Sequence, residues 1–256
     1  MSFLKYNLLR PAASTFVGLK NLQTVLSYDR FWIALQNSFT YGVLAYVIGV
    51  PLSLFLAWCM VTVTRGRKFY QFVTFLPVVV SMVAISMLFR MLMDPQMGAL
   101  NKVLQAVGLQ GLMWIHSSDT AMISIVVVDV WKGLGFNTLL FSTAMLNVPE
   151  SLYDAAKVDG AVGWKLFRHV TMPLIARTFA MVSILSVMGG LQVYTIVSVL
   201  GPGPGRSTLV LNQLLVGEAF TGWRFGFAAA LALIMFVIIL VLTIFQMRVL
   251  QPRWDY

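Results

Sequence analysis

Five apolar stretches, each long enough to cross a lipid bilayer as a helix, constrain this chain more than any other feature. They cover residues 33–63, 69–93, 120–147, 173–200 and 225–247. The hydrocarbon core of a bilayer requires about 20 helical residues. Because backbone N–H and C=O groups in lipid must be paired within the segment, these stretches are predicted to be helices. Pro51 and Pro77 interrupt two of them and predict kinks.

The composition excludes an ordinary soluble domain. Hydrophobic residues make up 59% of the chain and charged residues 11%, whereas soluble domains carry about 25% charged residues. The net charge of +9 would suit nucleic acid in a soluble protein, but the sequence has neither a basic stripe interleaved with aromatics nor zinc-finger spacing. Lipid is therefore the predicted surrounding, and nucleic acid is not an expected partner. The single cysteine, Cys59, excludes an intramolecular disulfide.

Positive charge predicts the orientation of the spans. Lys and Arg gather between the first two stretches, between or beside the third and fourth, and after the fifth: Arg65, Arg67, Lys68, Lys157, Lys165, Arg168, Arg177, Arg248 and Arg253. Since loops rich in Lys and Arg stay in the cytoplasm, we expect loop 148–172 and the C-terminal tail 248–256 to be cytoplasmic. The membrane domain would then cover 33–247, with 1–32 as an external N-terminal segment.

That N-terminal segment conflicts with the charge rule, since it contains Lys5, Arg10, Lys20 and Arg30. It is too polar to be a span and lacks an apolar core of signal-peptide length. Two interpretations stay open: a structured external segment, or a span that is missing upstream.

The polar connection between the third and fourth stretches is the most informative part of the chain. Pro149 suits the first turn of a short helix, with Asn147 or its neighbour as cap and Glu150 at the positive end of the helix dipole. Gly160 would end this helix in a turn that needs positive φ. A second helix would follow through Trp164 and Phe167.

Ala155 and Ala156 give the first of these helices a smooth patch where another backbone could approach closely. Charged residues surround the patch: Glu150, Asp154, Lys157 and Asp159. From the residues alone, this loop is either a docking element or a compact connection.

The same loop resembles a known family. Asp154-Ala155-Ala156, three residues, Gly160, nine residues and Val170-Thr171-Met172-Pro173 resemble the pattern of ATP-binding cassette importer permeases. That pattern reads Glu-Ala-Ala, three residues, Gly, nine residues, Ile-x-Leu-Pro. Here Asp replaces Glu, Val replaces Ile and Met replaces Leu, while the spacing is intact.

Further segments resemble the carbohydrate-uptake, maltose-type branch of the family, including sugar and glycerol-3-phosphate permeases. They are Phe16-Val-Gly-Leu-Lys-Asn21, Phe31-Trp-Ile-Ala-Leu-Gln-Asn-Ser38, Arg65-Gly-Arg-Lys-Phe-Tyr70, Trp131-Lys-Gly-Leu-Gly-Phe-Asn137, Gly201-Pro-Gly203 and Glu218-Ala-Phe220. Family members usually carry another span before the first of these segments. The resemblance therefore implies that this usual first span is missing here.

The resemblance implies an all-α integral membrane protein of the bacterial inner membrane, with about five transmembrane helices and a cytoplasmic helix–turn–helix coupling loop. It implies a second homologous permease subunit, a cytoplasmic ATPase dimer that uses ATP and Mg, and an extracytoplasmic solute-binding protein as partners. The solute would be a sugar or a related compound such as glycerol-3-phosphate, moved by alternating access. The residues expected to couple this movement to the ATPases are Glu150, Tyr153, Asp154, Ala155, Ala156, Asp159, Gly160 and Pro173.

Polar residues at membrane depth are candidates for the substrate path. Asp129 and Lys132 are spaced three apart in the third stretch, where they could neutralise each other or line the path. Asn137, Gln192 and Tyr194 suit a sugar, although hydrogen bonding between helices is the commoner use of such residues.

The sequence offers little support for an enzyme. It has no Gly-x-x-x-x-Gly-Lys-Ser/Thr phosphate loop, nucleophile elbow or metal-ligand pair, so no catalytic residue, metal or cofactor of its own is expected. An ion-coupled secondary transporter is the alternative function. It would favour buried carboxylates and discontinuous helices at mid-membrane, for which Asp129 is the one candidate carboxylate. A membrane-embedded enzyme is a third and weaker interpretation.

Overall fold

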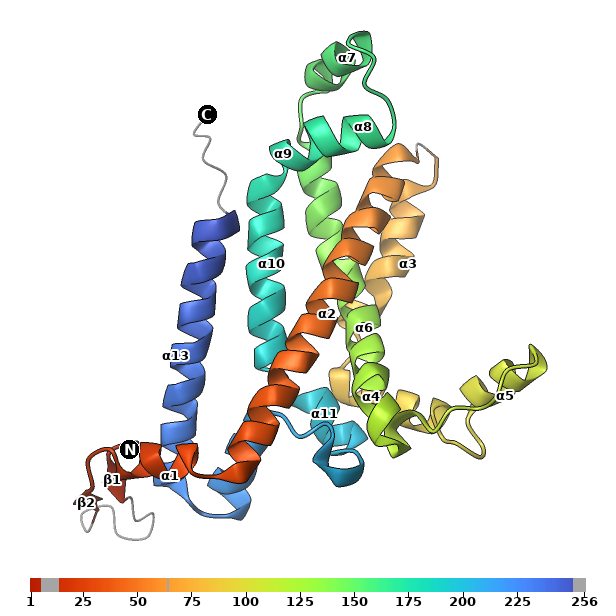
Figure 1. Cartoon of the computed structure of the whole chain (residues 1–256). Coiled ribbons are helices and arrows are strands. Elements are labelled where there is room, and N and C mark those ends of the chain that lie inside the picture. Colours follow the sequence, from red (N-terminus) through yellow and green to blue (C-terminus); the bar gives the residue numbers. More distant parts are fainter. Residues whose placement is uncertain (6–13, 64, 251–256) are drawn as a thin grey trace. The chain divides into compact units, whose positions relative to one another are not determined.

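The computed structural model describes residues 1–5, 14–63 and 65–250, and these residues are mostly helical (Figure 1). Arg10, within 6–13, and Arg253, within 251–256, lie outside the described residues. The chain divides into two compact units, which are described separately. Unit 1 comprises Met1–Leu44, Ser81–Val128 and Met188–Leu242, and unit 2 comprises Ala45–Val80, Asp129–Val187 and Thr243–Tyr256.

The described residues of the first half of the chain form two short strands, six α-helices and one 3₁₀ turn. The elements are β1 (Leu4–Lys5), β2 (Thr15–Phe16), α1 (Lys20–Leu26), α2 (Asp29–Thr62), α3 (Arg67–Val79), α4 (Met82–Leu92), α5 (Ala99–Ala106), the 3₁₀ turn η2 (Trp114–His116) and α6 (Ser118–Leu146). The strands pair antiparallel, with Leu4 opposite Phe16.

All regular elements described in the second half of the chain are helices or helical turns. These are α7 (Glu150–Val158), α8 (Trp164–Leu166), the π-helical turn η3 (Phe167–Thr171), α9 (Met172–Leu174), α10 (Ala176–Leu191), α11 (Thr195–Leu200), the 3₁₀ turn η4 (Pro204–Arg206), α12 (Leu211–Val216), the π-helical turn η5 (Gly217–Thr221) and α13 (Phe225–Leu250).

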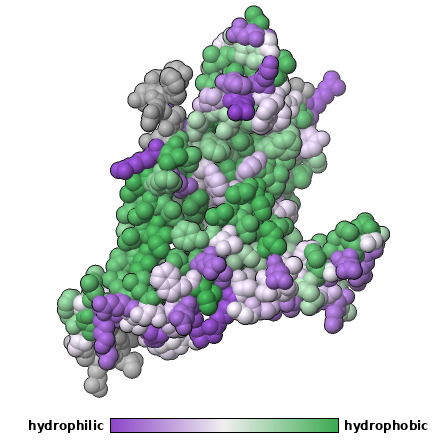
Figure 2. Space-filling view, viewed as in Figure 1, coloured by the Kyte–Doolittle hydropathy of each residue, from purple (hydrophilic) through white to green (hydrophobic). Residues whose placement is uncertain are grey.

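Among the described residues, four helical segments are long and apolar enough to cross a membrane: α2, α6, 176–200 and α13. The bent pair of α3 and α4 makes a fifth if it counts as one span. About five spans were predicted, and this number is confirmed. Their exposed apolar side chains fit a lipid surrounding: on α13, Val241 is 59% and Phe245 62% exposed. Figure 2 shows mainly hydrophobic colouring over the long helices.

The second and fourth predicted stretches are not single helices. α3 and α4 meet at a bend of 93°, where Val80 is extended (φ −74°, ψ 140°) and Ser81 begins α4. The predicted kink site, Pro77, lies three residues earlier inside α3. Ser81 takes the N-cap position of α4 without a side-chain capping bond, and the sequence has no proline or glycine at residues 80–81. In the fourth stretch, residues 192–194 separate α10 from α11, whereas α2 continues through Pro51.

Each unit has its own apolar core. In unit 1, Val25 and Phe31 pack with Leu211, Phe227 and Leu231, so the segment that precedes the first span is folded against α12 and α13. Asn21 also donates hydrogen bonds from Nδ2 to the carbonyls of Ser2 (2.8 Å) and Leu4 (3.0 Å).

The core of unit 2 joins the first, third and fourth spans to the connection after α6. Its buried members are Val50, Ala57, Phe141, Met145, Phe167, Ile175 and Val182. This core therefore holds one end of the predicted coupling loop.

Candidate functional site

The predicted coupling loop begins with an exposed helix. α7 starts at Glu150, directly after Pro149, and none of its nine residues is buried. Pro149 itself takes the N-cap position, and no side chain caps the helix, so the cap expected at Asn147 or its neighbour is wrong. Lys157 donates to Asp154 Oδ1 at 2.8 Å, and this hydrogen bond raises the pKa of Lys157. The lysine therefore stays charged at neutral pH.

Gly160 ends α7 as predicted, with φ +77°. The N–H of Gly160 donates to the Lys157 carbonyl at 3.0 Å, and the N–H of Ala161 donates to the Ala156 carbonyl at 2.9 Å. These two bonds form a Schellman motif, in which the residue after the helix cap adopts the left-handed conformation that glycine tolerates best. The turn thus depends on the backbone freedom of one residue.

The second part of the loop is anchored by aromatic side chains. Trp164 stacks on Phe167 with ring centroids 5.1 Å apart, and Trp58 of α2 lies 5.3 Å from Phe167 and 6.2 Å from Trp164. Phe167 and Thr171 are buried. The sequence predicted one regular helix here, but the chain forms α8, η3 and α9 in succession. Pro173 lies within α9, so the next span begins at Ala176.

The small-residue patch of α7 is open to a partner. Ala155 is exposed and Ala156 half-buried, while the charged residues that were expected around them, including Asp159, are exposed. Sequence reasoning missed the exposed apolar residues of the loop: Leu152 is 43% and Val158 88% exposed. A helical wheel over 150–158 would have placed them, but it cannot tell which face is uncovered. Tyr153 is half-buried, and its hydroxyl lies 3.5 Å from Thr171 Oγ1.

The substrate-path candidates divide between the two units. Lys132, in unit 2, donates from Nζ to the Val78 carbonyl at 3.2 Å, near the C-terminus of α3. A cation is favourable there because the last carbonyls of a helix are unpaired and its dipole is negative. This contact gives Lys132 a structural use. Its pairing with Asp129 stays a prediction. Asn137 is half-buried on α6.

Gln192 and Tyr194, in unit 1, lie at the break between α10 and α11. Both side chains are exposed, and the Gln192 carbonyl accepts a hydrogen bond from Asn212 Nδ2 at 2.9 Å. Discontinuous helices in transporters expose backbone and polar groups at substrate sites. The break therefore supports these two candidates, and no proline or glycine at 192–194 predicts it.

Metal ligation has no support in the part of the chain that the structure describes, because no group of three or more His, Cys, Asp or Glu side chains gathers there.

Comparison with known proteins decides the family. Residues 49–256 match the family described as the binding-protein-dependent transport system inner membrane component. The chain belongs to this family. It is therefore a membrane permease subunit of a binding-protein-dependent importer, and the resemblance of its loop and flanking segments is confirmed.

Several relatives match nearly the whole chain. It is 35% identical to a probable ABC transporter permease protein of Bacillus subtilis, over 91% of this chain and 82% of the relative. It is 32% identical to an sn-glycerol-3-phosphate transport system permease protein of Agrobacterium fabrum, over 95% and 84%. It is 29% identical to a trehalose/maltose transport system permease protein of Thermococcus litoralis, over 94% and 81%.

A solved structure has the same fold. A chain of a bacterial ABC transporter involved in the import of the acidic polysaccharide alginate superposes with a TM-score of 0.85 at 24% identity, covering 91% of this chain and 83% of that chain. The family and this likeness confirm the predicted membrane permease fold.

Proposed function

We propose that this permease moves a sugar or a related solute, such as glycerol-3-phosphate, across the bacterial inner membrane by alternating access. The solute class is supported by relatives named for glycerol-3-phosphate, arabinooligosaccharides and trehalose/maltose. A second permease subunit, an ATPase dimer that uses ATP and Mg, and a solute-binding protein would complete the importer. A solved relative of the same fold is in complex with a periplasmic protein that carries an alginate pentasaccharide.

The coupling role of α7 rests mainly on one observation, the contrast in burial between the first and second parts of loop 148–172. α7 has no buried residue, whereas Phe167 of η3 belongs to the core of unit 2. A helix without a buried residue that is joined to an anchored segment can receive a partner's movement and pass it to the spans. Loop 148–172 and the C-terminal tail would accordingly face the cytoplasm, where the ATPases bind, and residues 1–32 would face outward.

The path of the solute would use the polar candidates along the spans, namely Asp129, Lys132, Asn137, Gln192 and Tyr194. Hydrogen-bonding amides and an aromatic ring suit a hydroxyl-rich solute. The break at 192–194 would let the fourth span change shape between inward and outward states.

Replacing Gly160 with valine tests the coupling role. A β-branched residue in the left-handed conformation is strained by on the order of 1–2 kcal/mol, so the Schellman turn should distort. No atom lies within 4 Å of the position of an added Cβ, and steric clash is therefore not the cause. We expect the Gly160→Val complex to assemble in the membrane but to lose transport and the ATPase stimulation caused by the loaded binding protein.

Gly108→Val is the matched control. Gly108 has φ +80° and equally open surroundings, but it follows α5 in unit 1. It should suffer the same backbone strain while stimulation stays normal. Full ATPase stimulation in Gly160→Val, or an equal loss of stimulation in both variants, would refute the coupling role of the loop.

A further inference from the structure

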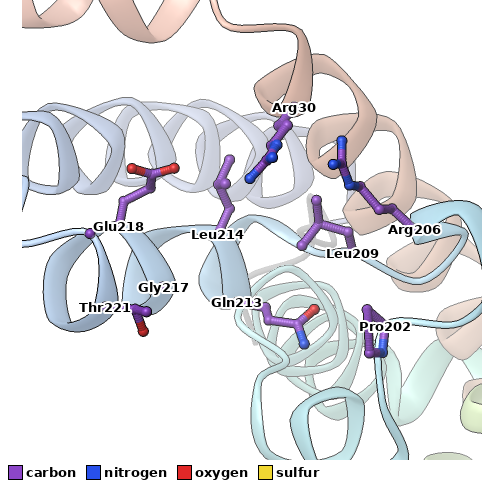
Figure 3. A pocket seen from close by; sticks show the side chains of 10 residues that line it. Arg30, Pro202, Arg206, Leu209, Gln213, Leu214, Gly217, Glu218 and Thr221 are labelled. Atoms are coloured by element: carbon purple, nitrogen blue, oxygen red, sulfur yellow. The ribbon is translucent and has the colours of Figure 1, made fainter.

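A pocket of about 490 Å³ lies in unit 1. Figure 3 shows its side chains: Arg30 comes from the start of α2, Arg206 from η4, and Gln213 from α12, with Glu218 and Thr221 from η5. The start of α2 and the stretch 202–222, which are far apart in sequence, thus contribute polar groups to one hollow.

The carboxylate of the pocket is already engaged. Glu218 Oε2 accepts from Arg224 Nη1 at 3.0 Å, and Oε1 accepts from the Tyr28 hydroxyl at 3.0 Å. Arg224 also lies over the Phe227 ring at 4.3 Å. This side chain is therefore held in place, and Glu218 is not free to neutralise the other arginines.

Two guanidinium groups of the pocket remain without a carboxylate. Among the described residues, no ion pair involves Arg30 or Arg206, and Arg30 lies over the Tyr28 ring at 5.9 Å. Arg206 has φ +67°, an uncommon conformation for a residue other than glycine. Asn37 Nδ2 stabilises it by donating to the Arg206 carbonyl at 3.0 Å. A contact from α2 thus holds the backbone that carries the Arg206 side chain.

Gln213 adds an unmet need. Its Oε1 atom is buried and finds no hydrogen-bond partner among the residues that the structure describes. A buried acceptor without a donor is costly. Gln213 lines the pocket, and a turn of its amide about the last side-chain bond would bring the buried Oε1 to a hydroxyl of a bound ligand.

Neighbouring aromatic residues place the pocket at a membrane surface. Arg30 is the second residue of the first candidate span. Trp32 is 53% exposed, and Trp223, beside the pocket residue Gly222, is 66% exposed. Exposed tryptophans next to apolar spans mark the headgroup level of a bilayer.

We propose that this pocket binds a phosphate ester that carries hydroxyl groups. Arg30 and Arg206 would contact the phosphate, since guanidinium groups match its oxygens in charge and geometry, and Gln213 would accept from a hydroxyl. A phosphatidylglycerol headgroup and free glycerol phosphate share this chemistry. The pocket's ligand need not be the transported solute, so its binding can be measured without transport.

The test uses the full chain, purified with its partner subunits in phosphatidylcholine nanodiscs. One arm adds phosphatidylglycerol and counts retained lipids by native mass spectrometry. The other titrates glycerol-3-phosphate by calorimetry. We expect selective binding in at least one arm, and the arm that responds identifies the source. The double variant Arg30→Gln/Arg206→Gln should weaken it by about tenfold or more, because it removes two charge-assisted contacts.

Two further variants separate the site from general charge and folding. Lys20→Gln/Lys102→Gln removes the same charge from exposed positions of unit 1 and should leave binding unchanged. Gln213→Leu should reduce the preference for phosphatidylglycerol over phosphatidic acid, whose headgroup has no glycerol hydroxyls.

Equal binding by the wild type and the double arginine variant, or no selective binding in either arm, would overturn the proposal. So would a double variant that loses only its affinity for the solute-binding protein, since the arginines would then meet a carboxylate of that partner.

Discussion

Gly190 shows how a single residue can decide whether two spans meet. A Cβ added at Gly190 of α10 would lie 2.8 Å from the Gly42 Cα of α2, whereas its neighbour Gly189 faces open space. Both glycines of the contact belong to unit 1. Small residues allow membrane helices to approach backbone to backbone, where packing is the main attraction.

We expect Gly190→Ala to destabilise the permease by about 1–3 kcal/mol, since overpacking forces the helices apart. Gly189→Ala should be neutral or stabilise by up to about 1 kcal/mol, because alanine is the better helix former. Thermal unfolding of both variants in the same detergent measures the difference. Equal midpoints would mean that the helices separate without cost.

Residue chemistry was predictable where it acts locally. Gly160 was expected at positive φ because a polar helix ended there, and it has φ +77°. Arg206 and Trp223 also have positive φ, but nothing in their neighbourhood predicts it. At Arg206 a contact distant in sequence helps to hold the backbone, since its carbonyl accepts a hydrogen bond from Asn37.

At the scale of elements, the connection between α4 and α5 is a turn organised by one carboxylate. Asp94 Oδ1 accepts from the N–H groups of Met97 (2.7 Å) and Gln96 (2.9 Å). These backbone bonds favour the charged form and hold the pKa of Asp94 below its ordinary value, with a smaller contribution from His116. A lowered pKa means that the stabilisation is present above pH about 3.9, the value of an unperturbed Asp, and is lost as pH falls through the lowered pKa.

Asp94→Asn should therefore loosen this turn at neutral pH. We expect faster amide hydrogen exchange at Gln96 and Met97 in the variant than in the wild type. After correction for intrinsic exchange, the wild-type rate should approach that of the variant only in strong acid. Asp119→Asn, at the start of α6, is the control and should leave these two amides unchanged. Unaltered protection in Asp94→Asn would show that the negative charge of Asp94 is not needed to hold the turn.

Element types followed from the sequence more readily than their breaks. Apolar length predicted the spans, and Gly160 with Pro149 predicted α7. The bend at Val80–Ser81 and the gap at 192–194 escaped prediction because each lies inside an apolar run without a breaker at the point itself. In lipid, neighbouring groups can pair the freed backbone atoms, so hydropathy does not reveal the interruption. Two of the predicted substrate-path residues, Gln192 and Tyr194, lie at one such break. A third, Lys132, makes a structural contact with the Val78 carbonyl.

At the scale of the whole molecule, the chain combines one anchored, exposed loop with spans that are interrupted twice. Discontinuous helices were expected of a secondary transporter, yet they occur in a chain that belongs to the binding-protein-dependent importer family. They therefore do not discriminate between the two energy sources. Composition predicted a membrane protein, and the spaced pattern from Asp154 to Pro173 identified the family. No pattern within the spans defined the solute, because a path is assembled from isolated side chains on several helices.

The energy source can be separated experimentally in cells that carry the complete importer. ATP depletion that preserves the proton gradient should abolish solute uptake, since the proposed coupling loop moves only when partner ATPases close on ATP. An uncoupler that collapses the gradient while ATP is maintained should leave initial uptake nearly unchanged. Gly160→Val should resemble the ATP-depleted wild type under both conditions, and Gly108→Val should resemble the untreated wild type. Uptake that instead follows the proton gradient and ignores ATP would assign this chain to ion-coupled transport, with Asp129 as the first residue to replace.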